Sequence, residues 1–159
     1  LCLPRRGNSR KRSYAVKKRI MGIDLGDVRT GLAVSDPLGV LAGGIGTFKG
    51  GGKRALAALI IEKAKEYSAE EFVIGDPINM NGTEGPRSEK CRLFADRLKE
   101  LVGVDVRMWD ERSSTVTAIG FMNDVNKRGK KRKEVLDSAA AAVILESYLA
   151  WRKNHPGEV

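Results

Sequence analysis

The sequence contains little cysteine and histidine and no long hydrophobic segment. Its 159 residues include two cysteines, Cys2 and Cys91, and a single histidine, His155. Two distant cysteines give no disulfide framework, and one histidine does not support a zinc site of the His/Cys type. No apolar run approaches the ~18 residues of a membrane span; the best candidate is residues 139–145. We therefore expect a soluble, cytoplasmic protein that does not enter a membrane.

The shortage of zinc ligands also narrows the choice of metal. Any catalytic metal must be held mainly by carboxylate oxygens, because the chain offers 20 acidic residues and one histidine. Oxygen ligands suit hard cations, so the composition favours Mg²⁺ or Mn²⁺.

The net charge of +9 is concentrated in two segments. Residues 1–19 hold eight basic residues and no acid, and residues 127–133 hold six basic residues in seven positions. A polarised charge suits contact with a polyanion such as nucleic acid. The alternative is that both segments are simply solvated.

The length fits one domain with its own hydrophobic core. Residues 1–19 show neither the apolar stretch of a signal peptide nor an amphipathic pattern, so we expect a basic tail that is disordered or not native to the domain. The predicted domain spans residues 20–153, and residues 154–159 form a C-terminal tail.

The apolar pattern predicts three consecutive strands followed by alternating helices and strands. This order indicates an α/β fold, in which a mixed five-stranded sheet, antiparallel for three strands and then parallel, carries helices on both faces. The predicted elements are a hairpin over 20–34, a strand over 40–48, a helix over 53–67, a strand over 72–75, a helix over 87–102, a strand over 104–109, a helix from 113 or 114 to 122, a basic loop over 127–133, and a helix over 134–152.

The first predicted strand is apolar except for Asp24, which precedes a glycine turn. Burying a lone carboxylate is costly unless it is paired or binds a cation. Asp24 is therefore either a structural exception or the first ligand of a metal or phosphate site.

Two further acidic positions lie where a central sheet would gather them. Asp110 and Glu111 end a predicted strand, and Asp137 begins a helix whose next residues are small. Carboxylates from several elements can hold metal ions for phosphodiester cleavage. The alternative is that Asp137 complements the helix dipole and that Asp110 and Glu111 are a solvated strand end.

Two segments could contact phosphate groups. The loop 79–87 brings backbone N–H groups, Thr83 and Arg87 to the start of a helix, where anions bind well. Arg112 and Ser113 precede the next predicted helix. Both segments could instead be ordinary capped turns.

Four collinear segments carry a resemblance to a known family. The segments 22–39, 73–90, 109–115 and 130–145 read GIDLGDVRTGLAVSDPLG, VIGDPINMNGTEGPRSEK, WDERSST and KKRKEVLDSAAAAVIL. Together they resemble the YqgF family, also called RuvX, which is described both as Holliday junction resolvases and as pre-16S rRNA nucleases. The resemblance covers residues 20–152 and implies an RNase H-like nuclease that uses a divalent metal on structured nucleic acid.

The resemblance also implies roles for particular residues. Asp24, Glu111 and Asp137 match the acidic residues of the family's first strand, DER motif and last helix, and are the expected catalytic metal ligands. Asp76 departs from the family, which usually has an apolar residue there; it is either an extra ligand or, as we expect, a capping acid. The expected nucleic-acid contacts are Arg29, Thr83, Arg87, Arg112, Ser113, Lys130, Lys131, Arg132 and Lys133.

Several readings of function stay open at this level. The first is processing of the 5′ end of pre-16S rRNA in ribosome biogenesis, and the second is resolution of DNA junctions in recombination and repair, for which a homodimer would suit a symmetric substrate. A non-catalytic nucleic-acid-binding module is a third, although all three acids are present. An actin-like or sugar-kinase ATPase begins with a similar hairpin but normally needs two copies of the fold.

Overall fold

The structure of the chain, a computed structural model, describes residues 18–113 and 130–155. Within those ranges it does not describe the side chains of residues 113 and 130–137. The predicted helix over 113–122 lies almost entirely outside the described residues, as do most of the predicted N-terminal tail and C-terminal tail.

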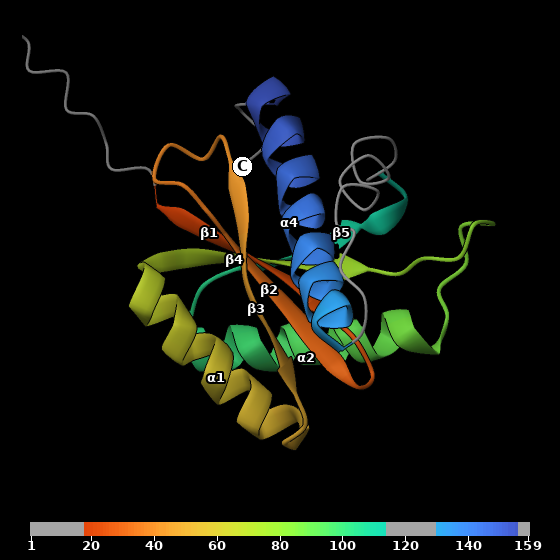
Figure 1. Cartoon of the computed structure of the whole chain (residues 1–159). Helices are drawn as coiled ribbons and strands as arrows, with labels where there is room; N and C mark the ends of the chain where they lie inside the picture. Colours follow the sequence, from red (N-terminus) through yellow and green to blue (C-terminus); the bar gives the residue numbers. More distant parts are fainter. Residues whose placement is uncertain (1–17, 114–129, 156–159) are drawn as a thin grey trace, which may run out of the picture.

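A five-stranded mixed sheet forms the centre of the molecule, with strand order β3-β2-β1-β4-β5 (Figure 1). β1 pairs antiparallel with β2 and parallel with β4, β2 pairs antiparallel with β3, and β4 pairs parallel with β5. The predicted sheet is confirmed. The strand bounds are β1 Arg19–Leu25, β2 Arg29–Ser35, β3 Ala42–Lys49, β4 Ala69–Asp76 and β5 Val106–Asp110.

Helices cover both faces of this sheet (Figure 1). α1, Gly52–Tyr67, and α2, Pro86–Val102, pack on one face, and α4, Lys130–Asn154, packs on the other. Strand alternation divides the core accordingly, because successive side chains point to opposite faces. Met21 and Ile23 of β1 join the core under α1 and α2, whereas Ile20 joins the core under α4.

One predicted element is wrong in its extent. The basic segment 127–133 was expected to be a loop, but its residues Lys130–Lys133 already belong to α4. Lysine and arginine are good helix formers, and no glycine or proline separates them from the helix that follows. High helix propensity therefore continues without a break from Lys130 into the helix predicted from residue 134, and α4 begins earlier than predicted.

α4 lies unusually close to the sheet because glycines face it. A Cβ added to Gly22 would lie 2.9 Å from Leu145 Cβ and 3.0 Å from the Ala141 carbonyl oxygen. A Cβ added to Gly44 of β3 would meet Ser138 Cβ at 2.9 Å. Small residues on both partners let the helix backbone approach the strands, as the alanine-rich start of α4 predicts.

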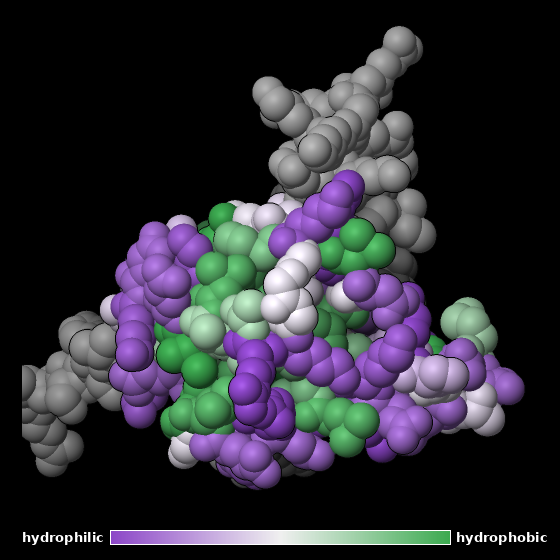
Figure 2. Space-filling model, turned by 90° about the horizontal axis from the view of Figure 1, so that it is seen from below, coloured by the Kyte–Doolittle hydropathy of each residue, from purple (hydrophilic) through white to green (hydrophobic). Residues whose placement is uncertain are grey.

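The opposite face, formed by α1 and α2, presents hydrophilic side chains with hydrophobic ones exposed between them (Figure 2). On α2, Leu93 and Leu101 are each 57% exposed. None of the described helices combines the length and hydrophobicity needed to cross a bilayer.

Candidate functional site

Two of the predicted acids lie at the carboxyl ends of parallel strands, at the same edge of the sheet. Asp24 lies near the end of β1, and Glu111 opens the short 3-10 helix η1, Glu111–Ser113, directly after β5. Asp24 is on the same side of its strand as Gly22, which faces α4. A Cβ added to Gly75 of β4 would lie 2.7 Å from Glu111 Oε1 and 2.6 Å from Ile144 Cδ1. The Glu111 carboxylate therefore occupies space that any other residue at position 75 would fill.

The electrostatics of Glu111 show that these carboxylates act on one another. Burial raises the pKa of Glu111, and the negative charge of Asp24 raises it further. Asp76 and Asp110 add smaller effects in the same direction, and Arg87 opposes them. Among the described residues that act on Glu111, three are acidic and one, Arg87, is basic.

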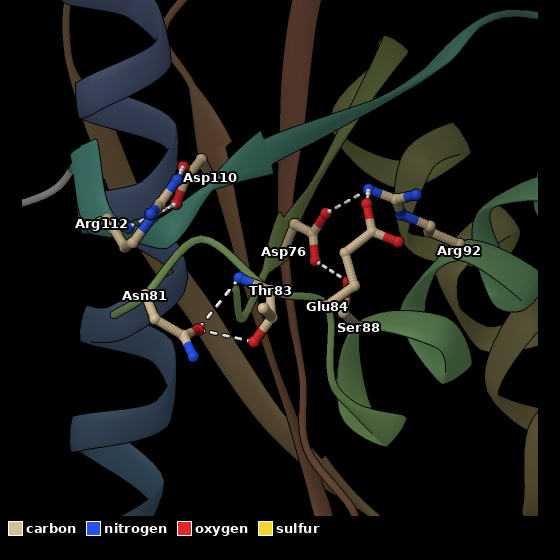
Figure 3. A network of polar contacts seen from close by, with 8 residues as sticks. All are labelled: Asp76, Asn81, Thr83, Glu84, Ser88, Arg92, Asp110 and Arg112. Atoms are coloured by element: carbon tan, nitrogen blue, oxygen red, sulfur yellow. Dashed lines mark hydrogen bonds and ion pairs between the residues drawn. The ribbon is translucent and has the colours of Figure 1, made fainter. Parts of the chain in front are cut away.

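Asp76 belongs to a different set of contacts, on the side of α2 (Figure 3). Its carboxylate is 2% exposed and accepts a hydrogen bond from the Ser88 hydroxyl. Arg92 Nη2 lies 3.3 Å from the other carboxylate oxygen and also pairs with Glu84. These contacts tie the start of α2, and through Glu84 the loop 77–85, to the end of β4. They are made by side chains rather than by the backbone N–H groups that the expected capping acid would bind.

Asp110 is likewise engaged, in this case by its neighbour Arg112. The Arg112 guanidinium donates from Nη2 to Asp110 Oδ2 at 2.7 Å and from Nε to the same oxygen at 3.0 Å (Figure 3). This hydrogen bonding lowers the pKa of Asp110. Arg112, expected to contact nucleic acid, is 39% exposed and holds Asp110 in this structure.

Thr83 lies in a compact hydrogen-bonded loop. Its backbone N–H and its hydroxyl both donate to Asn81 Oδ1, at 3.1 Å and 2.6 Å (Figure 3). The backbone N–H groups of Asn79 and Gly82 also donate within the loop. Hydrogen bonds within the loop thus stabilise its conformation, and these N–H and hydroxyl donors are already paired inside the loop.

The other predicted residues lie as follows. Arg87 lies in the first turn of α2 and acts electrostatically on Glu111. Arg29 begins β2 and is partly buried, on the same side of the sheet as Asp24 by alternation. The side chains of Asp137, Ser113 and the basic cluster lie outside the described residues; the cluster comprises Lys130, Lys131, Arg132 and Lys133. The backbone places Asp137 in α4, one turn before Ala141.

The buried Cys91 of α2 lies close enough to these acids for their charges to raise its pKa. Burial, followed by the charges of Glu111, Asp76 and Asp24, raises its pKa to about 11. The thiol is therefore protonated at neutral pH and is a poor nucleophile.

Sequence reasoning missed the residues that shape the site without reacting. Gly75 and Gly22 were not singled out, although each is a glycine within a predicted apolar strand, which often marks close approach of another backbone or side chain. Ser88 and Arg92 were missed as partners of Asp76. No local pattern points to them, because they lie 12 and 16 residues away in the sequence.

The donor set fits a hard divalent cation. Asp24 and Glu111 offer the carboxylate oxygens that hard cations prefer, and the charge of Asp24 raises the pKa of Glu111. Among the side chains that the structure describes, no three acidic, histidine or cysteine residues form a complete metal site. The third expected ligand, Asp137, is not among those side chains.

Comparisons with known proteins agree with this arrangement. The model of a family described as "RuvX: Holliday junction resolvase" matches residues 18–151. Proteins named "Putative pre-16S rRNA nuclease" from Bacillus thuringiensis (strain Al Hakam) and Bacillus cereus (strain B4264) are each 44% identical over 133 residues, which is 82% of this chain and 97% of theirs.

Solved structures show the same fold at low sequence identity. RuvC from Thermus thermophilus in complex with a Holliday junction substrate has a TM-score of 0.55 at 14% identity, covering 84% of this chain and 96% of that chain. A second structure of Thermus thermophilus RuvC gives 0.56 at 14% identity over the same shares. These likenesses establish an RNase H-like fold of the RuvC type. With the family model matched from residue 18 to residue 151, the chain belongs to the RuvX family, also called YqgF.

Proposed function

We propose that this chain is a metal-dependent nuclease that processes the 5′ end of pre-16S rRNA. The nuclease activity follows from membership of the RuvX family and from the names of relatives at 44% identity. The single observation in the structure that supports it is that Asp24 and Glu111 lie at the same edge of the sheet, at the carboxyl ends of parallel strands, with the Glu111 carboxylate in the space left by Gly75.

Asp24, Glu111 and Asp137 would hold the divalent cation, Mg²⁺ or Mn²⁺. When bound, such an ion lowers the pKa of a water and stabilises the leaving oxygen of a phosphodiester. The chain itself contributes by positioning the groups that would hold the ion. Gly75 leaves room for the Glu111 carboxylate, and Gly22 lets α4, the helix that contains residue 137, pack close to β1. Arg87 supplies positive charge beside the acids.

Phosphate groups of the substrate would be held by basic and polar residues around this edge. Such contacts give affinity without reading sequence, which suits a structured substrate with a bent backbone. Arg112 would have to leave Asp110 or contact phosphate with the atoms that remain exposed. The proposed contacts are Arg29, Thr83, Arg87, Arg112, Ser113, Lys130, Lys131, Arg132 and Lys133.

A side-by-side cleavage assay tests this proposal against its main rival. The purified chain is incubated with a precursor 16S rRNA 5′ end and with a four-way DNA junction, each with Mg²⁺, with Mn²⁺ and with EDTA. We expect metal-dependent cleavage of the RNA at a defined site and little cleavage of the junction.

Each other outcome of that assay selects a different function. Cleavage of the junction alone, by a dimeric species, would make the chain a DNA junction resolvase of recombination. Binding of either substrate without cleavage in any metal would make it a non-catalytic nucleic-acid-binding module.

Replacing Gly75 with alanine should impair cleavage while largely preserving the fold. The added Cβ meets the ends of two flexible side chains, Glu111 and Ile144, so both must move. We expect cleavage to fall by about 10–100-fold, the range seen when groups that orient a metal ligand are changed. The measurement is the cleavage rate together with the melting temperature.

Gly43→Ala is the matched control for that substitution. A Cβ at Gly43 meets nothing within 4 Å, so it tests the general cost of replacing a strand glycine. Equal cleavage by the Gly75→Ala variant and the unmodified chain would show that the position of the Glu111 carboxylate is not critical.

A further inference from the structure

A second feature lies at the same edge of the sheet, on the side of α1 and α2. It is a cavity of about 250 Å³ between the β1–β2 turn and the first turns of both helices. Its lining includes three cationic side chains from two helices, Lys53 of α1 and Arg87 and Lys90 of α2. Typical sites for drug-sized ligands measure about 300–1,000 Å³, so this one suits a smaller group.

The cavity has an excess of positive charge that the chain neutralises only in part. Among the described residues that line it, Asp27 is the one acid, against three cations. Lys90 Nζ lies 3.4 Å from Asp27 Oδ1, and both side chains are more than half exposed. An exposed pair at this distance is weak and can be exchanged for another anion.

The backbone around the cavity also favours an anion. Gly50 and Gly52 line the cavity, and at the start of α1, within the described residues, no side chain caps the helix and no acid occupies the first turn. The first-turn N–H groups of α1, which no described side chain caps, and the positive end of the helix dipole therefore lie with the three cations.

The cavity adjoins the proposed catalytic acids. Leu25, which lines it, directly follows Asp24 in β1. Arg87, which lines the cavity, lowers the pKa of Glu111 by its charge. Cys91, also in the lining, has its pKa raised by the charges of both Glu111 and Asp24. Asp24 faces α4 and the cavity lies on the other side of the sheet, so a strand whose phosphate lies at Asp24 and Glu111 would reach the cavity by passing around the end of β1.

We propose that this cavity binds a backbone phosphate of the nucleic-acid substrate, adjacent to the phosphate that is cleaved. The inference rests on the proposed nuclease function and adds Lys53 and Lys90 to the contacts of the substrate. The two lysines and Arg87 supply the charge, and the glycines let the backbone of the strand approach without a clash. The cavity thereby fixes the register of the strand relative to Asp24 and Glu111.

The test compares two double variants with the same change in net charge. Lys53→Ala with Lys90→Ala removes both lysines from the cavity. Lys65→Ala with Lys99→Ala removes one exposed lysine from the last turn of each of the same helices. Binding of a fluorescent single-stranded RNA to the full chain is measured in EDTA, where no cleavage occurs, at several salt concentrations.

We expect the cavity variant to bind about tenfold more weakly and the control to bind nearly as tightly as the unmodified chain. The slope of log K against log salt should fall by about 0.7 for the cavity variant, the value for one phosphate of a single strand. Melting temperatures establish that both variants are folded.

The outcomes separate this inference from the proposed function. If the unmodified chain binds RNA and the two double variants show equal affinities and equal salt slopes, the cavity assignment alone is overturned. Absence of RNA binding by the unmodified chain overturns both. Inorganic phosphate and ATP are tested as competitors of the RNA. One of them could raise the melting temperature of the unmodified chain but not of the cavity variant, while the two proteins bind RNA equally well. That result would assign the cavity to a free phosphate compound and overturn the strand assignment.

Discussion

The Asp24→Asn variant is expected to lose metal-dependent cleavage by on the order of a thousandfold, while it stays folded. Removing a direct ligand should cost more than the 10–100-fold typical of a residue that only orients a ligand. Asparagine has the same shape, so packing at the end of β1 is preserved. Removing the charge of Asp24 also removes its repulsion of Glu111, whose pKa that charge raises.

Cleavage rates in Mg²⁺ and Mn²⁺ and the melting temperature in EDTA measure these two effects separately. Asp96→Asn is the matched control, since Asp96 is an exposed acid on α2 away from the strand ends. Full cleavage by the Asp24→Asn variant would remove Asp24 from the catalytic site. A large drop in its melting temperature would instead make Asp24 a structural residue.

The Glu111→Gln variant is expected to lose cleavage and yet to be more stable than the unmodified chain in EDTA at neutral pH. Burial and the nearby Asp24 raise the pKa of Glu111 above the ordinary value of 4.5 for a glutamate, so the folded chain binds this proton more tightly than the unfolded chain. The free energy of unfolding therefore falls as pH rises from about 4.5 through the raised pKa. Glutamine carries no charge and escapes that loss.

Melting temperatures between pH 4 and pH 8 follow this effect directly. The two proteins should melt together near pH 4 and separate as pH rises, by about 2–4 °C for each kcal/mol gained. Added Mg²⁺ or Mn²⁺ should stabilise the unmodified chain and not the variant. Glu100→Gln, on the exposed side of α2, is the control. A variant less stable than the unmodified chain at pH 8 in EDTA would show that Glu111 makes stabilising contacts there.

Much of the fold was predictable because it depends on local periodicity. The alternation and apolar runs of β1, β2, β4 and β5 and the 3.6-residue pattern of α1 and α2 are properties of neighbouring residues. Their order then limits the sheet to few arrangements, since hairpins pair antiparallel and strand–helix–strand units pair parallel. The start of α4 was misplaced because a run of lysine and arginine fits both a solvated loop and a helix.

The candidate site was predictable in part. Asp24 and Glu111 could be selected as acids at the ends of apolar strands and by their place in the family motifs. Their neighbours Asp76 and Asp110 look equivalent in the sequence, yet each is held by side chains of its own, Asp76 by Ser88 and Arg92 and Asp110 by Arg112. The cavity beside them joins three segments of the chain and has no local signature.

The sequence by itself determined the order of the strands and helices, the family, and the supply of carboxylates without zinc ligands. Only the tertiary structure decided which residues each of these acids contacts. Strand pairing aligns Asp76 with Asp110 and Gly75 with Trp109, and the pleat sends alternate side chains to opposite faces of the sheet. The empty place at Gly75 then receives Glu111, while Asp76 turns to α2. Long-range register fixes these partners, and no stretch of neighbouring residues encodes it.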